Sequence, residues 1–382
     1  MDMAALTAKQ KKDYAGDSNQ KVSDFLAERV EKIFAKIDDG EYKNIWNHPV
    51  FSMPYKNLAS GTMYNLENSL LLQDSAFEKD YGTSFYLTAK QGFAEGLSNK
   101  GEKSHCIIKR FGVQLGYVKD KQEPGLVEDA DAKAKAIYIP AAKLTAVFNI
   151  AQFTGELPEK FKARLNTQTP KATPEELETV YQAVLETMPT KLVRVVGSNH
   201  YRPAADVIVM NPSNLFKSRL HELNTLLHEV SHSYGHESRK NRISLRDYSK
   251  DDKHRAYEEL VANLSAQSVI KHLDVTIDPH TREELDKGFM DNHTAYDVSW
   301  SRNNLTPADV MKAAHDADRT ANPIIYEVVT NLTTKYKANP ELPLNPTIKE
   351  MVIARISSES NPELEQDAPK KPYKKSTYKR KI

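Results

Sequence analysis

HELNTLLHEVSHSYGH, residues 221–236, is the stretch of this sequence that decides the fold of its C-terminal half. Its aliphatic residues recur at intervals of three and four, the spacing of one face of an α-helix: Leu223, Leu226, Leu227 and Val230. At about 100° per residue, His228 and His232 project together on the side opposite that stripe. The segment therefore predicts an amphipathic helix that buries its leucines and presents two imidazoles one turn apart.

Two imidazoles one helical turn apart can bind the same divalent cation, and this segment has the form H-E-x-x-H. Glu229 lies next to both histidines on the helix and can reach a water molecule on that cation. The alternative interpretation is a solvated helix face with two ordinary histidines. The helical context favours a zinc site, with His228 and His232 as ligands and Glu229 as the catalytic residue.

A catalytic zinc ion needs a third protein ligand. Downstream, AYEELVANLSAQSVI (residues 256–270) predicts another helix, and Glu259 lies on the face opposite its apolar stripe, among small residues that would let the two helices approach closely. The E-x-x-A-N spacing resembles the third-ligand helix of gluzincin-type peptidases. That resemblance implies Glu259 as the zinc ligand and Asn263 as the residue that orients a ligand histidine.

Other residues compete for the third position. Glu258 points about a quarter turn away from Glu259 and is expected to be a surface or capping carboxylate. His236 could continue the helical face as a ligand, but Gly235 is expected to end the helix, which favours a role behind the ligands or a purely structural role for His236. Metzincins have a third histidine where this chain has Ser238, so that class is disfavoured.

Such a site predicts hydrolysis of a peptide bond. Zinc lowers the pKa of a bound water molecule and polarises the scissile carbonyl, and Glu229 would accept the water proton and return it to the leaving amine. The extended run at 204–210 is a candidate edge strand for a peptide, with an ordinary core strand as the alternative. Tyr201 and His200 are candidate oxyanion donors.

Length and composition set further bounds. A chain of 382 residues is longer than one typical domain, so two domains are expected. Lys and Arg number 53 against 52 Asp and Glu, so the net charge does not indicate a polyanionic partner. The single cysteine, Cys106, excludes an intramolecular disulfide and suits a reducing cytoplasm. No stretch approaches the roughly 20 apolar residues of a membrane span, so we expect a soluble protein without a membrane partner.

The predicted fold class is α+β with two domains. An apolar stripe at helical spacing runs from Val22 to Phe34, and residues 44–118 have a mixed α/β pattern. After a polar stretch at 119–135, short strands are expected within 136–150. The expected division is an N-terminal domain at 1–155, a linker at 156–176, a mainly helical gluzincin-like domain at 177–350 and a disordered basic tail at 351–382.

Taken together, several stretches resemble the ArdC-type antirestriction proteins of plasmids and phages, over roughly residues 20–330. In the C-terminal half these are YRPAADVIVMN (201–211), LLHEVSHSYGH (226–236) and YEELVANLSA (257–266). In the N-terminal half they are YGTSFYLTAKQ (81–91), KGEK (100–103) and VFNIAQFTG (147–155), with Trp46, Pro49, Pro54, Asn57, Gly61, Tyr64 and Asn68. The chain departs from the family at Leu66, where a glycine is usual.

The resemblance implies that the first domain binds single-stranded DNA and protects entering mobile-element DNA from host restriction. Proteins that bind single strands combine cations along the phosphates with aromatic rings that stack on bases. Residues of these kinds in the first domain are Trp46, Tyr55, Lys56, Asn57, Tyr64, Tyr86, Lys90, Gln91, Lys100 and Lys103. The alternatives for the whole protein are an active peptidase that cleaves a host protein, and a non-catalytic DNA-binding protein with a structural zinc ion.

Overall fold

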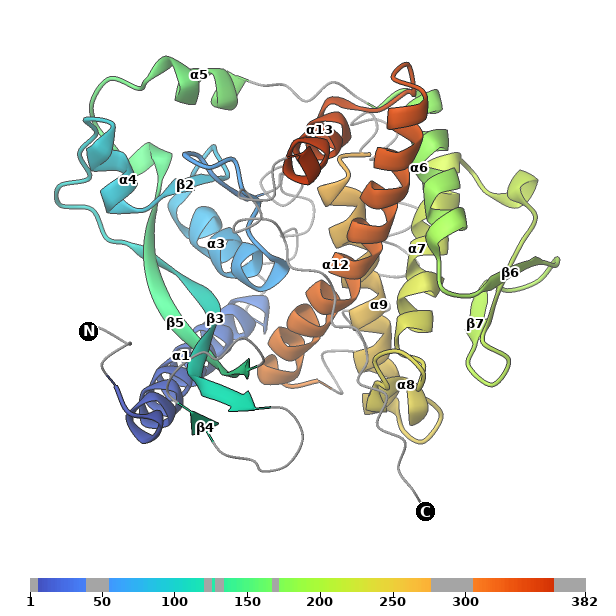
Figure 1. Ribbon diagram of the computed structural model, residues 1–382, viewed down its shortest axis with the longest axis horizontal. Helices are drawn as coiled ribbons and strands as arrows, with labels where there is room; N and C mark the ends of the chain where they lie inside the picture. The colour runs from blue at the N-terminus through green and yellow to red at the C-terminus, as the bar shows by residue number, and fades with distance from the viewer. Residues whose placement is uncertain are drawn as a thin grey trace. The chain divides into compact units, whose positions relative to one another are not determined.

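The computed structural model describes residues 6–38, 55–119, 126–127, 134–166, 172–275 and 305–360. The chain divides into two compact units: unit 1 contains residues 1–167 and 307–312, and unit 2 contains residues 168–306 and 313–382. Each unit combines helices with a β-sheet (Figure 1). The expected α+β class with two domains is therefore confirmed.

Unit 1 is built on a five-stranded sheet in the order β1-β2-β5-β3-β4. Its centre is a long antiparallel pair, β3 (His105–Lys119) and β5 (Ala134–Asn149). The region expected to hold separate short strands at 136–150 is thus one continuous strand. The remaining strands are short: β1 (Lys56–Asn57), β2 (Phe85–Leu87) and β4 (Leu126–Val127).

Helices cover this sheet. The long α1 (Ala8–Asp38) contains the stripe that begins at Val22, and it lies against β5, where Ser18 and Asn19 donate hydrogen bonds to backbone carbonyls of that strand. In α3 (Leu66–Lys79), the side-chain amide of Asn68 pairs with both backbone groups of Ile108 on β3. The short α4 (Ala89–Ala94) begins with a capping box formed by Thr88 and Gln91.

The described parts of the stretch expected to be a linker, 156–166 and 172–176, include helical residues. Helix α5 (Glu159–Asn166) belongs to unit 1, and its fully buried Phe161 packs against Leu58 and Leu87. Helix α6 (Pro174–Thr187) starts unit 2 with a capping box. The boundary between the units therefore lies near 167–168, later than the expected end of the first domain.

Unit 2 contains a three-stranded sheet in the order β6-β8-β7: β6 (Lys191–Arg194), β7 (His200–Arg202) and β8 (Val207–Met210). Strand β8 pairs with a neighbour on each side. A peptide cannot add to a strand whose two edges are already paired, so the expectation of an edge strand at 204–210 is wrong. No strand was expected at the position of β7 from the sequence.

The other described elements of unit 2 are mainly helices: α7 (Arg219–Tyr234), α8 (Ile243–Arg246), α9 (Asp252–His272), α12 (Pro307–Ala338) from residue 313 onwards, and α13 (Pro346–Ser360). The side chains of Ser218 and Asp251 cap the first turns of α7 and α9. Helix α13 corrects the expectation of a disordered tail from residue 351. The lysine-rich end of the chain, from 361 onwards, lies outside the described residues.

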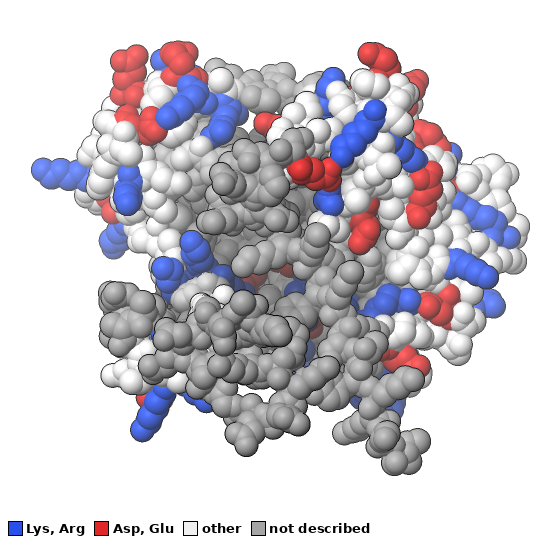
Figure 2. Space-filling view, viewed as in Figure 1, with Lys and Arg blue, Asp and Glu red and all other residues white. Residues whose placement is uncertain are grey.

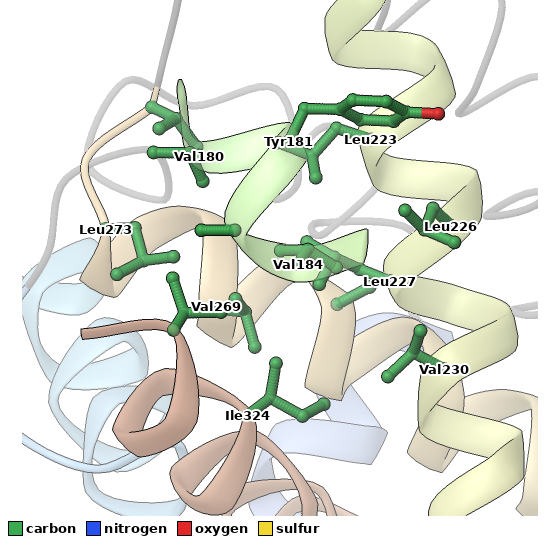
Figure 3. Packing of buried hydrophobic residues seen from close by; sticks show 14 of the residues in the cluster. Val180, Tyr181, Val184, Leu223, Leu226, Leu227, Val230, Val269, Leu273 and Ile324 are labelled. Atoms are coloured by element: carbon green, nitrogen blue, oxygen red, sulfur yellow. The ribbon is translucent and has the colours of Figure 1, made fainter. Parts of the chain in front are cut away.

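The core of unit 2 forms where α7 packs against its neighbours (Figure 3). The leucine stripe of α7 is buried as its spacing predicts. It meets apolar side chains from α6, α9 and α12, which include Val180, Tyr181, Val184, Val269, Leu273 and Ile324. This packing fixes the rotation of α7 about its axis, and so decides where its two histidines point.

The face of the molecule drawn in Figure 2 does not by itself indicate a polyanionic partner. Among the described residues, cationic and anionic side chains are interspersed over the face drawn in Figure 2. No helix in the described part of the chain has both the length and the apolar character needed to cross a membrane.

Candidate metal centre

Two helices of unit 2 bring three potential metal ligands together. His228 and His232 lie one turn apart on α7, and Glu259 lies on α9. The two Nε2 atoms are 3.0 Å apart, and the Glu259 carboxylate oxygens lie 3.2 Å from Nε2 of His228 and 3.5 Å from Nε2 of His232. The small residues expected to allow close approach, Ala262 and Ala266, are buried.

These separations fit a metal ion. Two ligands at about 2.0–2.1 Å from zinc and at the tetrahedral angle lie about 3.3 Å from each other. The two Nε2 atoms are 3.0 Å apart, and one carboxylate oxygen of Glu259 lies 3.2 Å from His228 while the other lies 3.5 Å from His232, so each separation is close to that value. Two imidazoles and one carboxylate are also the donor types that catalytic zinc sites use.

The outer nitrogen of each imidazole is held by a hydrogen-bond acceptor. Nδ1 of His228 donates to Oδ1 of Asn263 at 2.6 Å, and Nδ1 of His232 donates to Oε1 of Glu258 at 3.1 Å. A proton on Nδ1 leaves the lone pair on Nε2, the atom that faces the cluster. The position expected for Asn263 therefore agrees with the structure, whereas the contact of Glu258 with His232 was not expected.

Glu258 is not a surface carboxylate. Its side chain is 0 % exposed, because α9 is covered on this side as well as on its apolar stripe. It accepts hydrogen bonds from the guanidinium of Arg242 and, at 2.6 Å, from the hydroxyl of Ser244. The expectation of an exposed or capping role for this residue is wrong.

The electrostatics of the cluster favour a bound cation. Burial lowers the pKa of His232, but the carboxylates of Glu259 and Glu258 outweigh burial and raise this pKa to about 10. The pKa of His228 is raised in the same way, chiefly by Glu259 against the effect of burial. For Glu259, burial raises the pKa, but the two imidazoles lower it by more. The pKa of Glu259 therefore lies well below its usual range. Positive charge between these groups is thus stabilised.

Glu229 is placed differently from the other acids. It is buried, 5 % exposed, beside His228 on α7. None of the hydrogen bonds or ion pairs within the described residues involves its carboxylate. A carboxylate next to the cluster that is not committed to another partner is free to accept a proton from water.

Tyr248 is a neighbour that the sequence did not indicate. Its hydroxyl donates a hydrogen bond of 2.6 Å to Oε1 of Glu259, and its ring meets His232 edge-on with centroids 6.5 Å apart. Burial and the adjacent Glu259 raise the pKa of Tyr248. Its hydroxyl therefore stays protonated and can donate this hydrogen bond. No motif marks this tyrosine, because it lies in the connection between α8 and α9.

Three expected residues lie elsewhere. His236 follows the end of α7, and its Nδ1 pairs with the hydroxyl of Ser238 at 2.9 Å, not with the cluster. Among the described residues His236 therefore does not support a ligand of the cluster, and the alternative of a local structural role agrees with its hydrogen bonds to Ser238. The hydroxyl of Tyr201 donates to Asp206, and both nitrogens of His200 have partners on their own segment, so the oxyanion assignments are not supported.

The DNA-binding candidates of unit 1 divide by burial. Tyr86 is 0 % exposed and Tyr55 is 3 % exposed, so neither ring can stack on a base, and these two assignments are wrong. Trp46 lies outside the described residues. The side chains that reach solvent are the exposed Lys90, Lys100 and Lys103 and the half-buried Lys56, Asn57, Tyr64 and Gln91.

Three of the half-buried side chains form a polar cluster. The amide of Asn57 exchanges hydrogen bonds of 3.0 and 3.2 Å with Gln91 and lies 3.4 Å from the hydroxyl of Tyr64. Asn57 also accepts from the backbone of Ala59 and Ser60, so it organises the turn after β1. The sequence expectation thus selected residues that lie together, although Asn57 and Gln91 are 34 positions apart in the chain.

Comparison with known proteins supports both units. Residues 23–148 match the model of the N-terminal domain of anti-restriction factor ArdC, and residues 180–300 match a zincin-like metallopeptidase. The metal-free structure of the antirestriction ArdC protein from the R388 plasmid is 25% identical with a TM-score of 0.55, covering 80% of this chain and 98% of that chain. Its Mn(II)-bound structure is also 25% identical, with a TM-score of 0.54, covering 79% and 97%.

The DNA primase TraC of Escherichia coli is 28% identical over 240 residues, which are 61% of this chain and 15% of TraC. The chain thus spans a small part of that relative. The zincin-like match, the His228, His232 and Glu259 cluster and the Mn(II)-bound relative together indicate a divalent-metal site. The two matched models follow each other in the order of the two units, and the solved structures align over nearly their whole length, which together support an ArdC-type protein.

Proposed function

We propose that this chain is an antirestriction protein of a mobile genetic element, with a single-stranded DNA-binding unit 1 and a zinc-dependent peptidase in unit 2. One observation carries the second half: one ligand atom each from His228 and His232 on α7 and Glu259 on α9 lie within 4.8 Å of one another. The family supports the first half, since residues 23–148 match an ArdC N-terminal domain.

The donor set favours zinc over other abundant divalent ions. Magnesium and calcium prefer ligand shells of oxygen atoms, whereas imidazole suits zinc. His228, His232 and Glu259 would hold the ion and leave a fourth position for water or substrate. When bound, zinc lowers the pKa of water and polarises a carbonyl group.

The residues around the ion supply the proton transfers. Glu229 accepts a proton from the attacking water and returns it to the leaving amine of the peptide. Asn263 and Glu258 hold the imidazoles, and Tyr248 holds the carboxylate of Glu259. The substrate is a protein or peptide of the host.

Substituting Glu229 by glutamine separates the peptidase from the alternatives, because glutamine has the same size and both histidines stay in place. We expect Glu229→Gln to retain bound metal and to lose cleavage of fluorescein-labelled casein. His232→Ala removes a ligand and should lose both the bound metal and the cleavage of casein. The proposal fails if Glu229→Gln cleaves casein as the wild type does.

The same variant tests what the metal unit contributes in cells. The assay is the efficiency with which a plasmid enters a restricting host that expresses either protein. Loss of cleavage with full antirestriction would show that DNA binding is the primary activity. Loss of both would show that protection depends on proteolysis. Retention of both would show that the metal is structural.

DNA binding is tested on the full chain with a labelled oligothymidylate. The lysines at 100 and 103 are exposed in unit 1, and the lysines at 250 and 253 are exposed in unit 2. Neutralising the first pair should reduce the slope of log affinity against log salt by about 1.4, at roughly 0.7 for each lost phosphate contact. The second pair is the charge-matched control and should leave the slope unchanged. If neutralising either pair of lysines changed the slope equally, the proposal that unit 1 binds the DNA would be contradicted.

A further inference from the structure

The glycine that follows α7 is required for space, not for its backbone conformation. Gly235 caps the helix with φ of −72°, which any residue can adopt. A Cβ at this position would lie 2.8 Å from Nη2 and 2.9 Å from Cζ of Arg242. Such distances are below van der Waals contact, so the guanidinium lies where it does because position 235 has no side chain.

Arg242 uses that space to join three helices. Its side chain is 7 % exposed and donates to the backbone carbonyl of Ser231 on α7 at 2.8 Å and to the hydroxyl of Thr320 on α12 at 3.1 Å. Its remaining hydrogen bonds go to both carboxylate oxygens of Glu258 on α9. Two parallel hydrogen bonds of this kind fix the plane of a carboxylate.

Glu258 passes this orientation to a candidate metal ligand. The same oxygen, Oε1, that accepts from Arg242 also accepts the Nδ1 hydrogen of His232. A carboxylate in this position fixes the tautomer and rotation of a ligand histidine and makes its other nitrogen a better donor. Burial of Glu258 without Arg242 would leave an unpaired charge in the protein interior, which is strongly destabilising.

We propose that Gly235, Arg242 and Glu258 are positioning residues that act in series on His232. The glycine leaves room for the guanidinium, the guanidinium holds the carboxylate, and the carboxylate aims Nε2 of His232 at the metal. This inference rests on the proposed metal site. It assigns the two adjacent glutamates of α9 opposite tasks: Glu259 contacts the ion, and Glu258 supports a ligand from behind.

The test measures Co²⁺ binding by the full chain, through its visible absorption spectrum and its dissociation constant. Glu258→Gln should weaken Co²⁺ binding by about 10- to 100-fold, the usual effect of losing such a partner. Ser244→Ala is a milder variant, since it removes only one hydrogen bond to Glu258. Gly235→Ala and Arg242→Lys should both weaken binding and change the Co²⁺ spectrum, which reports ligand geometry.

Two comparisons separate positioning from general destabilisation. Glu222→Gln is the control, because Glu222 is also a buried glutamate but lies on α7. It is paired with arginines, and none of its hydrogen bonds or ion pairs within the described residues involves either histidine. It should lower thermal stability and leave Co²⁺ affinity unchanged. In addition, Gly235→Ala should weaken Co²⁺ binding little further when Arg242 is already lysine, because both changes act through the same guanidinium.

The outcomes are distinct. Unchanged Co²⁺ affinity in folded Glu258→Gln or Ser244→Ala would overturn the role of Glu258. Equal weakening by Glu222→Gln would show that stability alone is responsible, and fully additive losses at 235 and 242 would overturn the role of the glycine. Absence of Co²⁺ binding by the wild type would instead refute the metal site itself.

Discussion

Replacing Glu222 by glutamine should destabilise unit 2 most at neutral pH and least in acid. The carboxylate is 1 % exposed in the first turn of α7. It accepts hydrogen bonds from the hydroxyls of Tyr181 at 2.7 Å and Ser213 at 2.8 Å, and it pairs with Arg194 and Arg219. This one side chain therefore ties α6, β6 and the turn before α7 to the helix that carries the candidate ligands.

The sign of the pH effect follows from the pKa of Glu222. Burial raises this pKa, but the hydrogen bonds from Tyr181 and Ser213 and the charge of Arg194 lower it by more, so it lies below its usual value. The unfolded chain has the ordinary value of about 4.3. The stabilisation is therefore complete above that pH and is lost as the pH falls from about 4.3 through the lower pKa of the folded state.

The loss in free energy of unfolding caused by Glu222→Gln lies between two limits. Removing one partner of a buried ion pair costs about 3–5 kcal/mol, whereas exposed pairs contribute about 0–1 kcal/mol. The side chains of Arg194 and Arg219 are 28 % and 34 % exposed, so water compensates part of the loss. We expect Glu222→Gln to cost about 2–3 kcal/mol at neutral pH, which corresponds to a fall of about 4–12 °C in the melting temperature of unit 2.

Scanning calorimetry of both proteins at neutral pH and near pH 3.5 measures this directly. The difference in melting temperature should shrink in acid, because the wild type loses its advantage there while glutamine does not titrate. A difference that stays constant over this pH range would refute the electrostatic argument. A variant as stable as the wild type at neutral pH would refute the argument from burial.

Three further outcomes are expected. Gly92→Ala should destabilise unit 1 by about 1–3 kcal/mol in urea unfolding, because the new Cβ would lie 2.1 Å from Cε1 of Phe153; an unchanged midpoint would contradict this close contact. Tyr248→Phe should weaken Zn²⁺ binding by about 2- to 10-fold in a chelator competition, because it removes the hydrogen bond to Glu259; unchanged affinity would show that the hydroxyl does not position the carboxylate. Adding Zn²⁺ at 100 times its dissociation constant should stabilise unit 2 by about 2.7 kcal/mol, and Glu259→Ala should abolish the shift in melting temperature.

The sequence predicted the centre of unit 2 because local spacing carried the information. The helical period placed the α7 leucines in the core and His228 and His232 on one side, and the structure agrees. The spacing from Glu259 to Asn263 likewise put both side chains on the face of α9 that meets α7. Contacts within one or two turns of a helix depend little on the rest of the fold.

The errors concern contacts between distant segments. Glu258 looked exposed because a single helix wheel shows only one apolar stripe, whereas Arg242 and Ser244 cover its other side. Tyr55 and Tyr86 looked available for stacking, but they pack in the core of unit 1. The three-residue strand β7 is too short to produce an alternating pattern, which is why β8 was placed at the edge of the sheet.

Helix α1 has a protective role that follows from its place beside β5. Within the described part of the chain, only the last residues of β5 pair with β2, and no described strand pairs with the rest of β5 on that side. The side chains of Ser18 and Asn19 instead occupy backbone carbonyls of Ala142 and Pro140. Open edges of this kind recruit strands from other molecules. A shortened protein that began near residue 23 would keep the matched domain but lose this cover, and it should self-associate and precipitate during purification.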